Sequence, residues 1–129
     1  MVRIIETGSC GNNATYALWN TGLLEINGTG DMTTKAFRKR TDIKDVIINN
    51  GITNISSEAF SQCSMLTSIT IPNSVTSIDN YSFNMCFALT SITIPDNVTT
   101  IGTGAFNSCT SLASITIPAG VTTIQGYTF

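Results

Sequence analysis

The residues that could do chemistry in this chain are few, and their types exclude most catalytic sites. The 129-residue sequence contains no histidine, which excludes Ser-His-Asp and Cys-His arrangements, imidazole bases and His-ligated metals. Every lysine lies at or before Lys44. The later carboxylates fall at unrelated positions, at Glu58, Asp79 and Asp96. We therefore expect that the protein is not an enzyme, and that it has no cofactor and no catalytic, cofactor-binding or metal-binding residue.

Four cysteines remain as reactive groups, and three of them are regularly spaced. Cys63, Cys86 and Cys109 follow one another at a constant interval, and no CxxC pair indicates a metal site. Neighbouring strands lie about 4.8 Å apart, a spacing that would permit a disulfide. Because such a bridge would break the equivalence of the three positions, we expect free, buried thiols that fill small apolar spaces. Cys10 lies outside this series and has no assigned role.

A set of hydroxyl side chains repeats at the same interval. The tripeptide Ser-Ile-Thr occurs three times, with hydroxyls at Ser68, Thr70, Ser91, Thr93, Ser114 and Thr116. Since alternate side chains of a strand point to opposite faces, these six residues would share one exposed face, which is our candidate binding face. They are equally well explained as solvated positions of high β propensity. A two-column hydroxyl array is also similar to Thr-x-Thr ice-binding faces, which is an alternative function.

These intervals belong to an internal repeat that covers most of the chain. Segments that begin at Ile43, Leu66, Leu89 and Leu112 align without a gap, and the last one stops short at Phe129. Apolar residues recur at fixed positions of the copies, at Ile69, Ile92 and Ile115; Ile71, Ile94 and Ile117; Val75, Val98 and Val121; Ile78, Ile101 and Ile124; and Phe60, Phe83, Phe106 and Phe129. One coil cannot bury its own apolar face, but stacked coils align such residues in continuous columns. The sequence therefore predicts a solenoid.

Within a coil, the pattern predicts two short strands and a turn. The alternation from Ser68 to Ile71 indicates a short parallel strand. Proline lacks the amide hydrogen that would extend the strand pairing, and it follows this strand in three copies, at Pro72, Pro95 and Pro118. Val75 and Ile78 fit a second short strand. Phe83 and Cys86, three residues apart, fit a single 3₁₀ or α turn.

The region before the repeats predicts a β-hairpin. The runs from Thr15 to Trp19 and from Leu23 to Asn27 are rich in β-forming residues and flank a turn with Asn and Gly. A hairpin laid across the first coil would cover the apolar end of the solenoid. We expect Trp19 to pack against the coil that begins at Ile43, although its ring could instead form a platform for a ligand.

The repeat pattern LxxIxIPxxVxxIxxxxFxxC resembles the BspA-like class of leucine-rich repeats. The family's N-terminal cap is similar to the segments Cys10-Gly11, Thr15 to Trp19, Asn20-Thr21-Gly22 and Gly28-Thr29-Gly30. The resemblance implies a β-rich solenoid of leucine-rich repeat coils with short parallel strands and 3₁₀ or helical turns. A capping hairpin and linker would occupy residues 1–42, and four 23-residue repeats, the last incomplete, residues 43–129. The basic AFRKR segment departs from the family, which often has an aromatic-rich linker there.

The resemblance also implies a non-enzymatic module that binds proteins or mediates adhesion on a cell surface or in secreted form. A host or matrix protein would be the partner, and no ligand residue can be transferred from the family. The first residues, MVRIIETGSC, lack the apolar core of a signal peptide. The alternatives are the ice-binding array and a purely structural fragment of a longer array.

Composition and charge narrow the kinds of partner. Charged residues make up 11% of the chain, against roughly 25% in an average soluble domain, so Ser, Thr and Asn must supply the polar surface. The net charge of −2 argues against nucleic acid, and no apolar stretch reaches the roughly 18 residues of a membrane-spanning helix. The basic segment from Lys35 to Lys44 could bind an anionic partner, but such a run is more often a solvated face or loop.

The last coil suggests a further partner, a second copy of the chain. A solenoid needs covered ends to stay soluble, and the last repeat has no polar segment after it. Its exposed edge would comprise Ile115, Ile117, Val121, Ile124 and Phe129. We therefore expect a homodimer joined through this coil, the alternative being that the coil frays or folds over itself.

Overall fold

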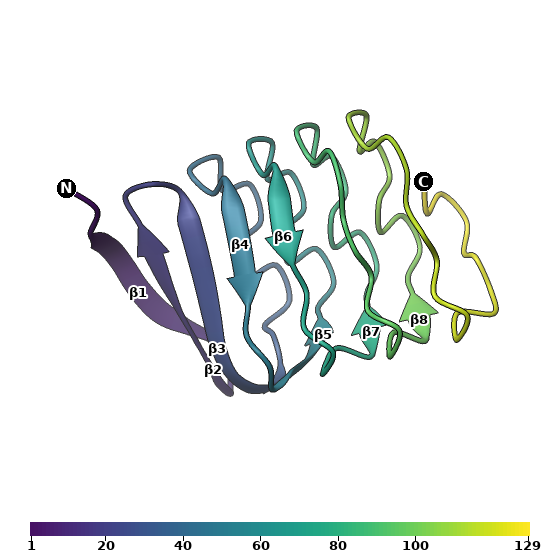
Figure 1. Ribbon diagram of the computed structural model, residues 1–129, viewed down its shortest axis with the longest axis horizontal. Helices are drawn as coiled ribbons and strands as arrows, with labels where there is room; N and C mark the ends of the chain where they lie inside the picture. The colour runs from purple at the N-terminus through teal and green to yellow at the C-terminus, as the bar shows by residue number, and fades with distance from the viewer.

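The computed structural model describes all residues 1–129 and begins with an antiparallel sheet of three strands (Figure 1). β1 (Ile4–Gly11) pairs with β2 (Asn13–Trp19), and β2 pairs with β3 (Leu23–Asp31). The predicted hairpin is thus confirmed, with Leu18 opposite Leu24. Its turn requires glycine at Gly22, which has a φ of 89°. β1, which pairs with this hairpin at the N-terminal edge of the sheet, was not predicted.

Strand β3 joins this cap to the solenoid. The first half of β3 pairs in parallel with β4 (Asp45–Ile48), and its last residues pair in parallel with β5 (Ile52–Ile55). The cap therefore covers the first coil, as expected. The division into a cap of residues 1–42 and repeats of residues 43–129 stays a prediction, because β3 belongs to both arrangements.

Beyond β3, the coils stack on two strand-bearing sides. On the first side, β4 pairs in parallel with β6 (Ser68–Thr70), and Val46 lies opposite Ile69. On the second side, β5 pairs with β7 (Ser77–Ile78), and β7 pairs with β8 (Thr100–Ile101). Partners lie one full repeat apart in each of these pairs, so the sequence period is also the structural period. The predicted solenoid is confirmed.

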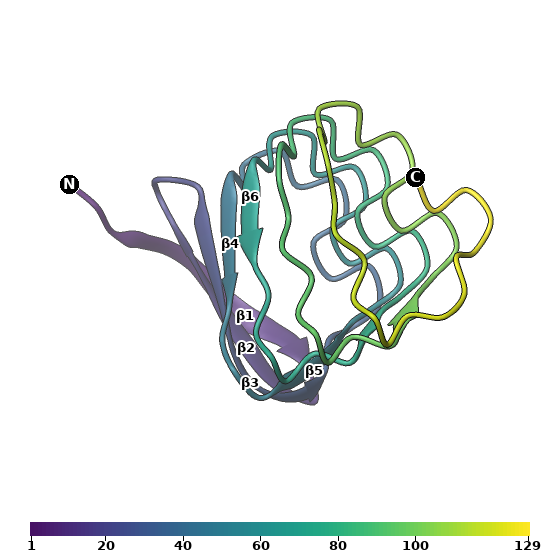
Figure 2. The ribbon, with the colours of Figure 1, turned by 45° about the vertical axis from the view of Figure 1, so that its right-hand side comes forward.

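The third side of each coil is a series of turns, seen stacked over one another in Figure 2. No helix forms here, so the 3₁₀ or helical form predicted at Phe83 and Cys86 is not confirmed. The reason is that Tyr81 and Met85, with φ of 56° and 61°, adopt the left-handed conformation and break any helical run. Isolated hydrogen bonds between residues three apart close the turns, as from the Cys86 amide to the Phe83 carbonyl, and they do not continue into a helix.

Main-chain hydrogen bonds join the turns of successive coils. The amide of Phe60 donates to the carbonyl of Ser82, and the amide of Phe83 donates to that of Ala105. Glu58 and Gln62, on either side of Phe60, donate to the next coil in the same way, as do the residues equivalent to them in the neighbouring coils. This ladder runs as far as the bond from Phe106 to Thr128, so the turn side is the most regular part of the solenoid.

The core lies between the three sides and consists of aligned apolar columns. Five phenylalanine rings stack at centroid distances of 5.5 to 5.9 Å, at Phe37, Phe60, Phe83, Phe106 and Phe129. The first four rings are completely buried. The series starts one coil earlier than the repeat predicted from the sequence, at Phe37.

The structure has no helix with the length and apolar character that a membrane span requires.

Candidate functional site

The candidate binding face lies on the first strand-bearing side of the solenoid. All six of its hydroxyl residues are exposed, as predicted: Ser68, Thr70, Ser91, Thr93, Ser114 and Thr116. β6 presents Ser68 and Thr70 while it buries Ile69 between them, which is the alternation expected of a strand with one face in the core. Two further exposed residues of β4, Asp45 and Ile47, extend the two columns toward the cap.

The end of this face nearest the cap is acidic and internally hydrogen-bonded. The hydroxyl of Ser68 donates to Asp45 Oδ1 at 2.7 Å. One strand earlier, the Asn49 side-chain amide donates to Glu25 Oε2 at 3.2 Å and to Asn27 Oδ1 at 2.7 Å. Asn49 occupies the position of proline in the other coils, and its side chain binds the cap instead. A partner would therefore meet carboxylates at one end and hydroxyls along the rest of the face.

The strand ladder of this side stops at β6. The amide of Thr90 donates one long hydrogen bond of 3.5 Å to the carbonyl of Thr67, and the Ser-Ile-Thr segments at 91–93 and 114–116 form no strand. The expected strand is thus present in one of the three copies. The six hydroxyls do not lie on a continuous, evenly paired sheet, so nothing in the arrangement favours the ice-binding alternative, which needs a flat and regular array.

Trp19 was expected to pack against the first coil, but it does not. It lies at the end of β2 opposite Ile4 and is not among the partly buried apolar residues that pack against the core. Leu18, which precedes it, is completely buried. Since successive residues of a strand point to opposite faces, Leu18 packs onto the first coil and Trp19 lies on the outer face of the cap.

A charged cluster, made of Glu6, Tyr16, Arg40 and Asp42, fastens the cap to the first turn segment. Arg40 donates from both terminal nitrogens to the Glu6 carboxylate at 3.0 Å, and it holds Asp42 at 2.9 and 3.0 Å. The Tyr16 hydroxyl donates to Glu6 Oε2 at 2.6 Å. Paired, planar contacts of this kind are the strongest that arginine forms with carboxylates.

These contacts change the acidity of the groups involved. Hydrogen bonds from Arg40, and then from Tyr16, lower the pKa of the Glu6 carboxyl. Arg40 likewise lowers the pKa of Asp42, whereas the carboxylate of Glu6 raises the pKa of the Tyr16 hydroxyl. Both carboxylates are therefore ionised at neutral pH, and the cluster is a structural ion pair.

The basic segment is largely neutralised, which limits its use as an anion site. Lys35 and Arg38 lie 3.7 and 3.6 Å from the carboxylate of Glu58 in the next coil, and Arg40 belongs to the charged cluster. Lys39 and Lys44 make no ion pair. The segment is thus a turn of the solenoid that binds its neighbours, and two of its cations remain available.

All four cysteines are free thiols, as predicted, but Cys109 is only partly buried, whereas burial was expected for all three cysteines of the series. Beyond filling space, three of them donate hydrogen bonds: Cys63, Cys86 and Cys109 each bind the carbonyl of a phenylalanine in the preceding coil. Burial raises the pKa of Cys63 to about 12 and that of Cys109 to about 11, so these thiols are poor nucleophiles. Cys10 is buried in the core from β1, and burial raises its pKa to about 11.

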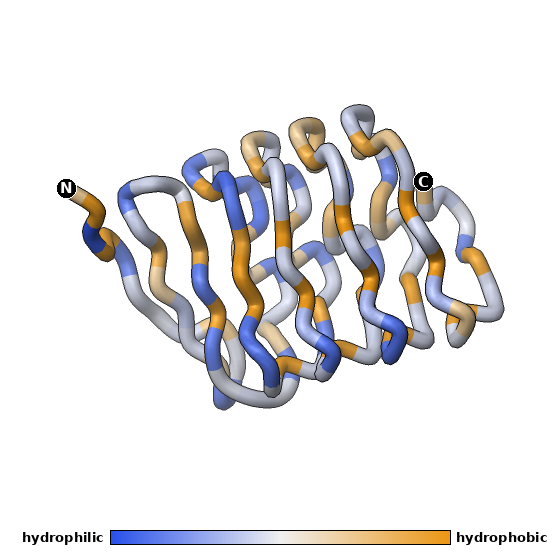
Figure 3. The backbone as a smooth tube through the Cα atoms, in the orientation of Figure 1, coloured by the Kyte–Doolittle hydropathy of each residue, from blue (hydrophilic) through white to orange (hydrophobic).

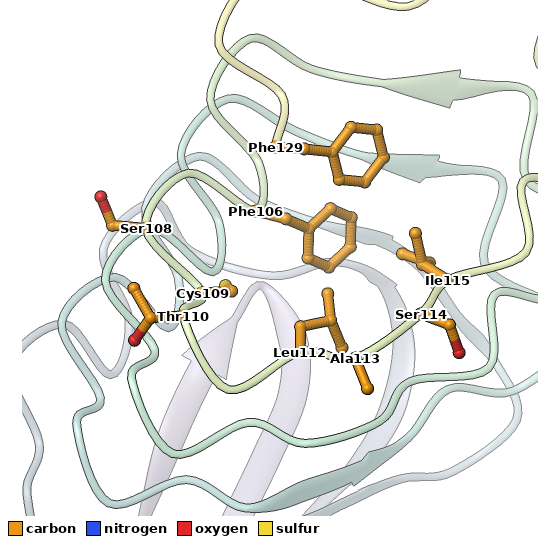
Figure 4. A pocket seen from close by; sticks show the side chains of 9 residues that line it. All are labelled: Phe106, Ser108, Cys109, Thr110, Leu112, Ala113, Ser114, Ile115 and Phe129. Atoms are coloured by element: carbon orange, nitrogen blue, oxygen red, sulfur yellow. The ribbon is translucent and has the colours of Figure 1, made fainter.

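An apolar pocket of about 390 Å³ lies at the last coil. Figure 4 shows the stacked rings of Phe106 and Phe129, with Leu112 and Ile115, which line the pocket from the chain segment between them, nearby. Ile115, Ile117 and Val121 are partly buried, and Ile124 and Phe129 are exposed. The predicted exposed edge is thus confirmed for Ile124 and Phe129 only, and its other three residues are half-buried.

The sequence carries a signal for two structural positions that the repeat analysis misses. Phe37 and Arg40 lie one repeat period before Phe60 and Cys63, so the segment AFRKR is a copy of the turn segment AFSQC. The signal is hidden because β3 pairs with β4 one residue short of that period, as between Leu24 and Val46. Arg40 replaces the cysteine where the turn faces the cap.

Comparisons with known proteins agree with this architecture. The sequence model of the BspA type leucine rich repeat region matches residues 16–129 in six copies. None of the curated proteins matches the chain in sequence. Among solved structures, a leucine-rich repeat protein from Eubacterium ventriosum superposes with a TM-score of 0.84 at 28% identity, over 98% of this chain and 35% of its own.

Two further structures extend the comparison. A leucine-rich repeat protein from Bacteroides ovatus gives a TM-score of 0.80 at 26% identity, over 99% of this chain and 37% of its own. The pneumococcal vaccine antigen PcpA gives 0.74 at 27% identity, over 79% and 25%. The chain thus spans little more than a third of the length of the first two structures. With a matching repeat model over most of its length and the same solenoid, the chain belongs to the BspA type leucine-rich repeat family.

Proposed function

We propose that this chain is a non-enzymatic protein-binding module that takes part in adhesion. The observation that carries the proposal is the row of exposed hydroxyls from Ser68 to Thr116, held on a scaffold whose core is continuous through the stacked phenylalanines. Repeat scaffolds present such equivalent positions as an extended surface for protein recognition. The acidic end at Asp45 and Glu25 gives the surface a direction, because it favours a partner with a basic group at that end.

Location on a cell surface or in secreted form is part of the proposal. A relative of 27% identity is described as a vaccine antigen, and an antigen that serves in a vaccine is one that antibodies can reach. The surface rich in Ser, Thr and Asn is compatible with such a setting. A host or matrix protein is then the expected class of partner.

Binding measurements on a panel of purified extracellular-matrix proteins test the proposal. Surface plasmon resonance would compare the native chain with Thr93→Glu, which adds a charge to the hydroxyl face. The matched control is Thr99→Glu, an exposed residue that precedes β8 on the second side. We expect a partner whose affinity falls about tenfold with Thr93→Glu, as for a central interface position, and is unchanged with Thr99→Glu. Equal effects of both variants, or of neither, would contradict the proposed face.

A further inference from the structure

A groove crosses the turn side of the solenoid, away from the hydroxyl face. Its volume is about 420 Å³, and each of three successive turn segments contributes two lining residues: Lys39 and Thr41, Gln62 and Ser64, and Met85 and Phe87. The groove therefore runs along the axis of the solenoid, across the coils, with a lysine at one end and two large apolar side chains at the other.

The apolar end is unusually exposed for side chains of its kind. Phe87 is 44% exposed, Met85 37% and the neighbouring Met65 48%. The upper row of turns in Figure 3 shows the change, since the first turn is largely hydrophilic whereas the second and third are more apolar. In the following coil, Ser108 and Thr110 replace Met85 and Phe87. The apolar cluster is thus confined to one place, as is typical of an interaction site.

The polar end carries a free positive charge. Lys39 is exposed and makes no ion pair, because the acids of the neighbouring turns are bound elsewhere. Asp42 pairs with Arg40, and Glu58 lies between Lys35 and Arg38. No carboxylate lines the groove. A ligand group placed beside Lys39 would be attracted if it were anionic and repelled if it were cationic.

The distance between the two ends sets the spacing of the complementary groups. The stacked rings of Phe37, Phe60 and Phe83 mark the three coils, and their centroids are 5.6 Å apart at each step. Two such steps separate the first coil of the groove from the third by about 11 Å. In a peptide in the polyproline II conformation, a residue and the third residue after it are about 9 Å apart. Because that conformation repeats at every third residue, such side chains lie on one face of the peptide. The long, flexible side chain of Lys39 covers the difference.

We propose that this groove binds an extended peptide segment of a partner protein. The segment carries an acidic side chain, which lies beside Lys39, and an aromatic or other large apolar side chain three positions later, which packs against Met85 and Phe87. The groove is independent of the hydroxyl face, so the chain would have two recognition surfaces on different sides of the same coils.

A labelled heptapeptide with the sequence Ser-Asp-Thr-Ser-Phe-Thr-Ser tests the proposal by fluorescence anisotropy on the full chain. A second peptide with Lys in place of Asp is the charge control. Lys39→Glu should weaken binding of the acidic peptide about tenfold and reverse the preference between the two peptides. Phe87→Ser should weaken the acidic peptide about tenfold, as expected for an aromatic contact. Thr93→Glu adds a negative charge on the hydroxyl face and should leave both affinities unchanged.

Several results would overturn the proposal. These are the absence of peptide binding at millimolar protein, equal affinity for the two peptides, or a loss of binding with Thr93→Glu that matches the loss with Lys39→Glu. Self-association that Phe87→Ser abolishes would assign the groove to a second copy of the chain and would equally overturn it. The hydroxyl face is judged separately, because a matrix protein that depends on Thr93 and not on Lys39 supports that face whatever the peptides do.

Discussion

The thiol of Cys86 donates a hydrogen bond to the carbonyl oxygen of Phe60 over 3.2 Å, and so ties one turn segment to the one before it. This bond joins the column of cysteines to the column of phenylalanines in the core. A thiol is a weak donor, but the same bond recurs from Cys63 to Phe37 and from Cys109 to Phe83. The cysteine column is therefore part of the hydrogen bonding between coils as well as of the packing.

The thiols should be present in full and should react slowly. In denaturant, titration with a colorimetric disulfide reagent should give four free thiols per chain. In the folded protein at pH 8 we expect slow reaction, because burial raises the pKa of Cys63 to about 12 and leaves little thiolate. Cys109 is the least buried of the four, so Cys109→Ala should remove the fastest phase. A titre below four in denaturant would reveal a disulfide and contradict the free column.

Loss of a central ring should be costly. Phe83→Ala is expected to lower the free energy of unfolding by about 3 to 5 kcal/mol, because the ring is completely buried and stacks on Phe60 and Phe106. Urea titration followed by circular dichroism measures the change. Phe87→Ala is the matched control at a position where the ring is 44% exposed, and it should cost clearly less, about 1 kcal/mol. A loss for Phe83→Ala as small as that of the control would show that the column does not hold the coils together.

One buried hydroxyl should be dispensable. Ser82 is completely buried and its Oγ has no hydrogen-bond partner, whereas the equivalent positions of the neighbouring coils hold Ala59 and Ala105. Ser82→Ala removes an unpaired polar group from the core and should stabilise the protein by about 1 kcal/mol. The reverse change, Ala105→Ser, should destabilise it by a similar amount in the same urea titration. If both variants prove less stable, the hydroxyl must be satisfied in solution.

The cap should be weakened by acid through the charged cluster. Glu6 and Asp42 have a lowered pKa in the folded protein, so the unfolded chain takes up protons first as the pH falls. Their contribution is complete above the ordinary carboxyl pKa of about 4 and is lost as the pH falls through the folded value. Glu6→Gln should therefore lower the stability to urea at pH 7, by about 1 kcal/mol or less for so exposed a pair.

Repeating the titration at pH 3 provides the control for this prediction. There the native chain and Glu6→Gln should differ less in their unfolding midpoints, because the carboxylate that the variant lacks is losing its charge in the native chain. A difference that is as large at pH 3 as at pH 7 would mean that Glu6 acts through packing and not through its charge.

We propose that residues 1–129, expressed by themselves, self-associate through their last coil, most simply as a two-fold dimer. Ile124 and Phe129 are exposed there, and the apolar pocket beside Phe106 is open. Light scattering should report a dimer for the native chain and a monomer for Ile117→Lys. Ile124→Lys, at a position that is already exposed, should act in the same way without disturbing the coil. A native chain that is monomeric at high concentration would contradict the expectation, as would a dimer that neither variant affects.

The periodic part of the fold could be predicted from the sequence because the period repeats the same environment at every coil. Ile69, Ile78 and Phe83 each have counterparts one period away, and such a pattern has few structural solutions other than stacked coils. The left-handed turn residues could not be predicted from their types, since Glu58 and Tyr81 favour no such conformation. Only Gly104, which has a φ of 64° at the equivalent position, is a residue type that indicates a left-handed conformation there.

The cap and the candidate site were harder to predict from the sequence, because they depend on contacts that do not repeat. Glu6 and Arg40 are 34 residues apart and meet once in the chain, so no comparison between copies can reveal the pair. β1 has only one fully buried residue, Cys10, and its two isoleucines are exposed, so its residue types lack the apolar and polar alternation typical of a strand. The groove requires Lys39 and Phe87 to lie on one line across three coils, which follows only when the turn segments are known to begin at Phe37.

The hydrogen bonds between successive turns give the turn side of the solenoid a net dipole along the solenoid axis. On the turn side, every amide that joins two coils points toward the later coil, as from Phe60 to Ser82. On the first strand-bearing side the amide of Thr67 points the other way, toward Lys44. Peptide dipoles of about 3.5 D that are aligned add up as they do in a helix, so the turn side has its positive end at the C-terminal coil. A further coil or a second chain that continued this ladder would meet its free end with carbonyl groups and not with amides.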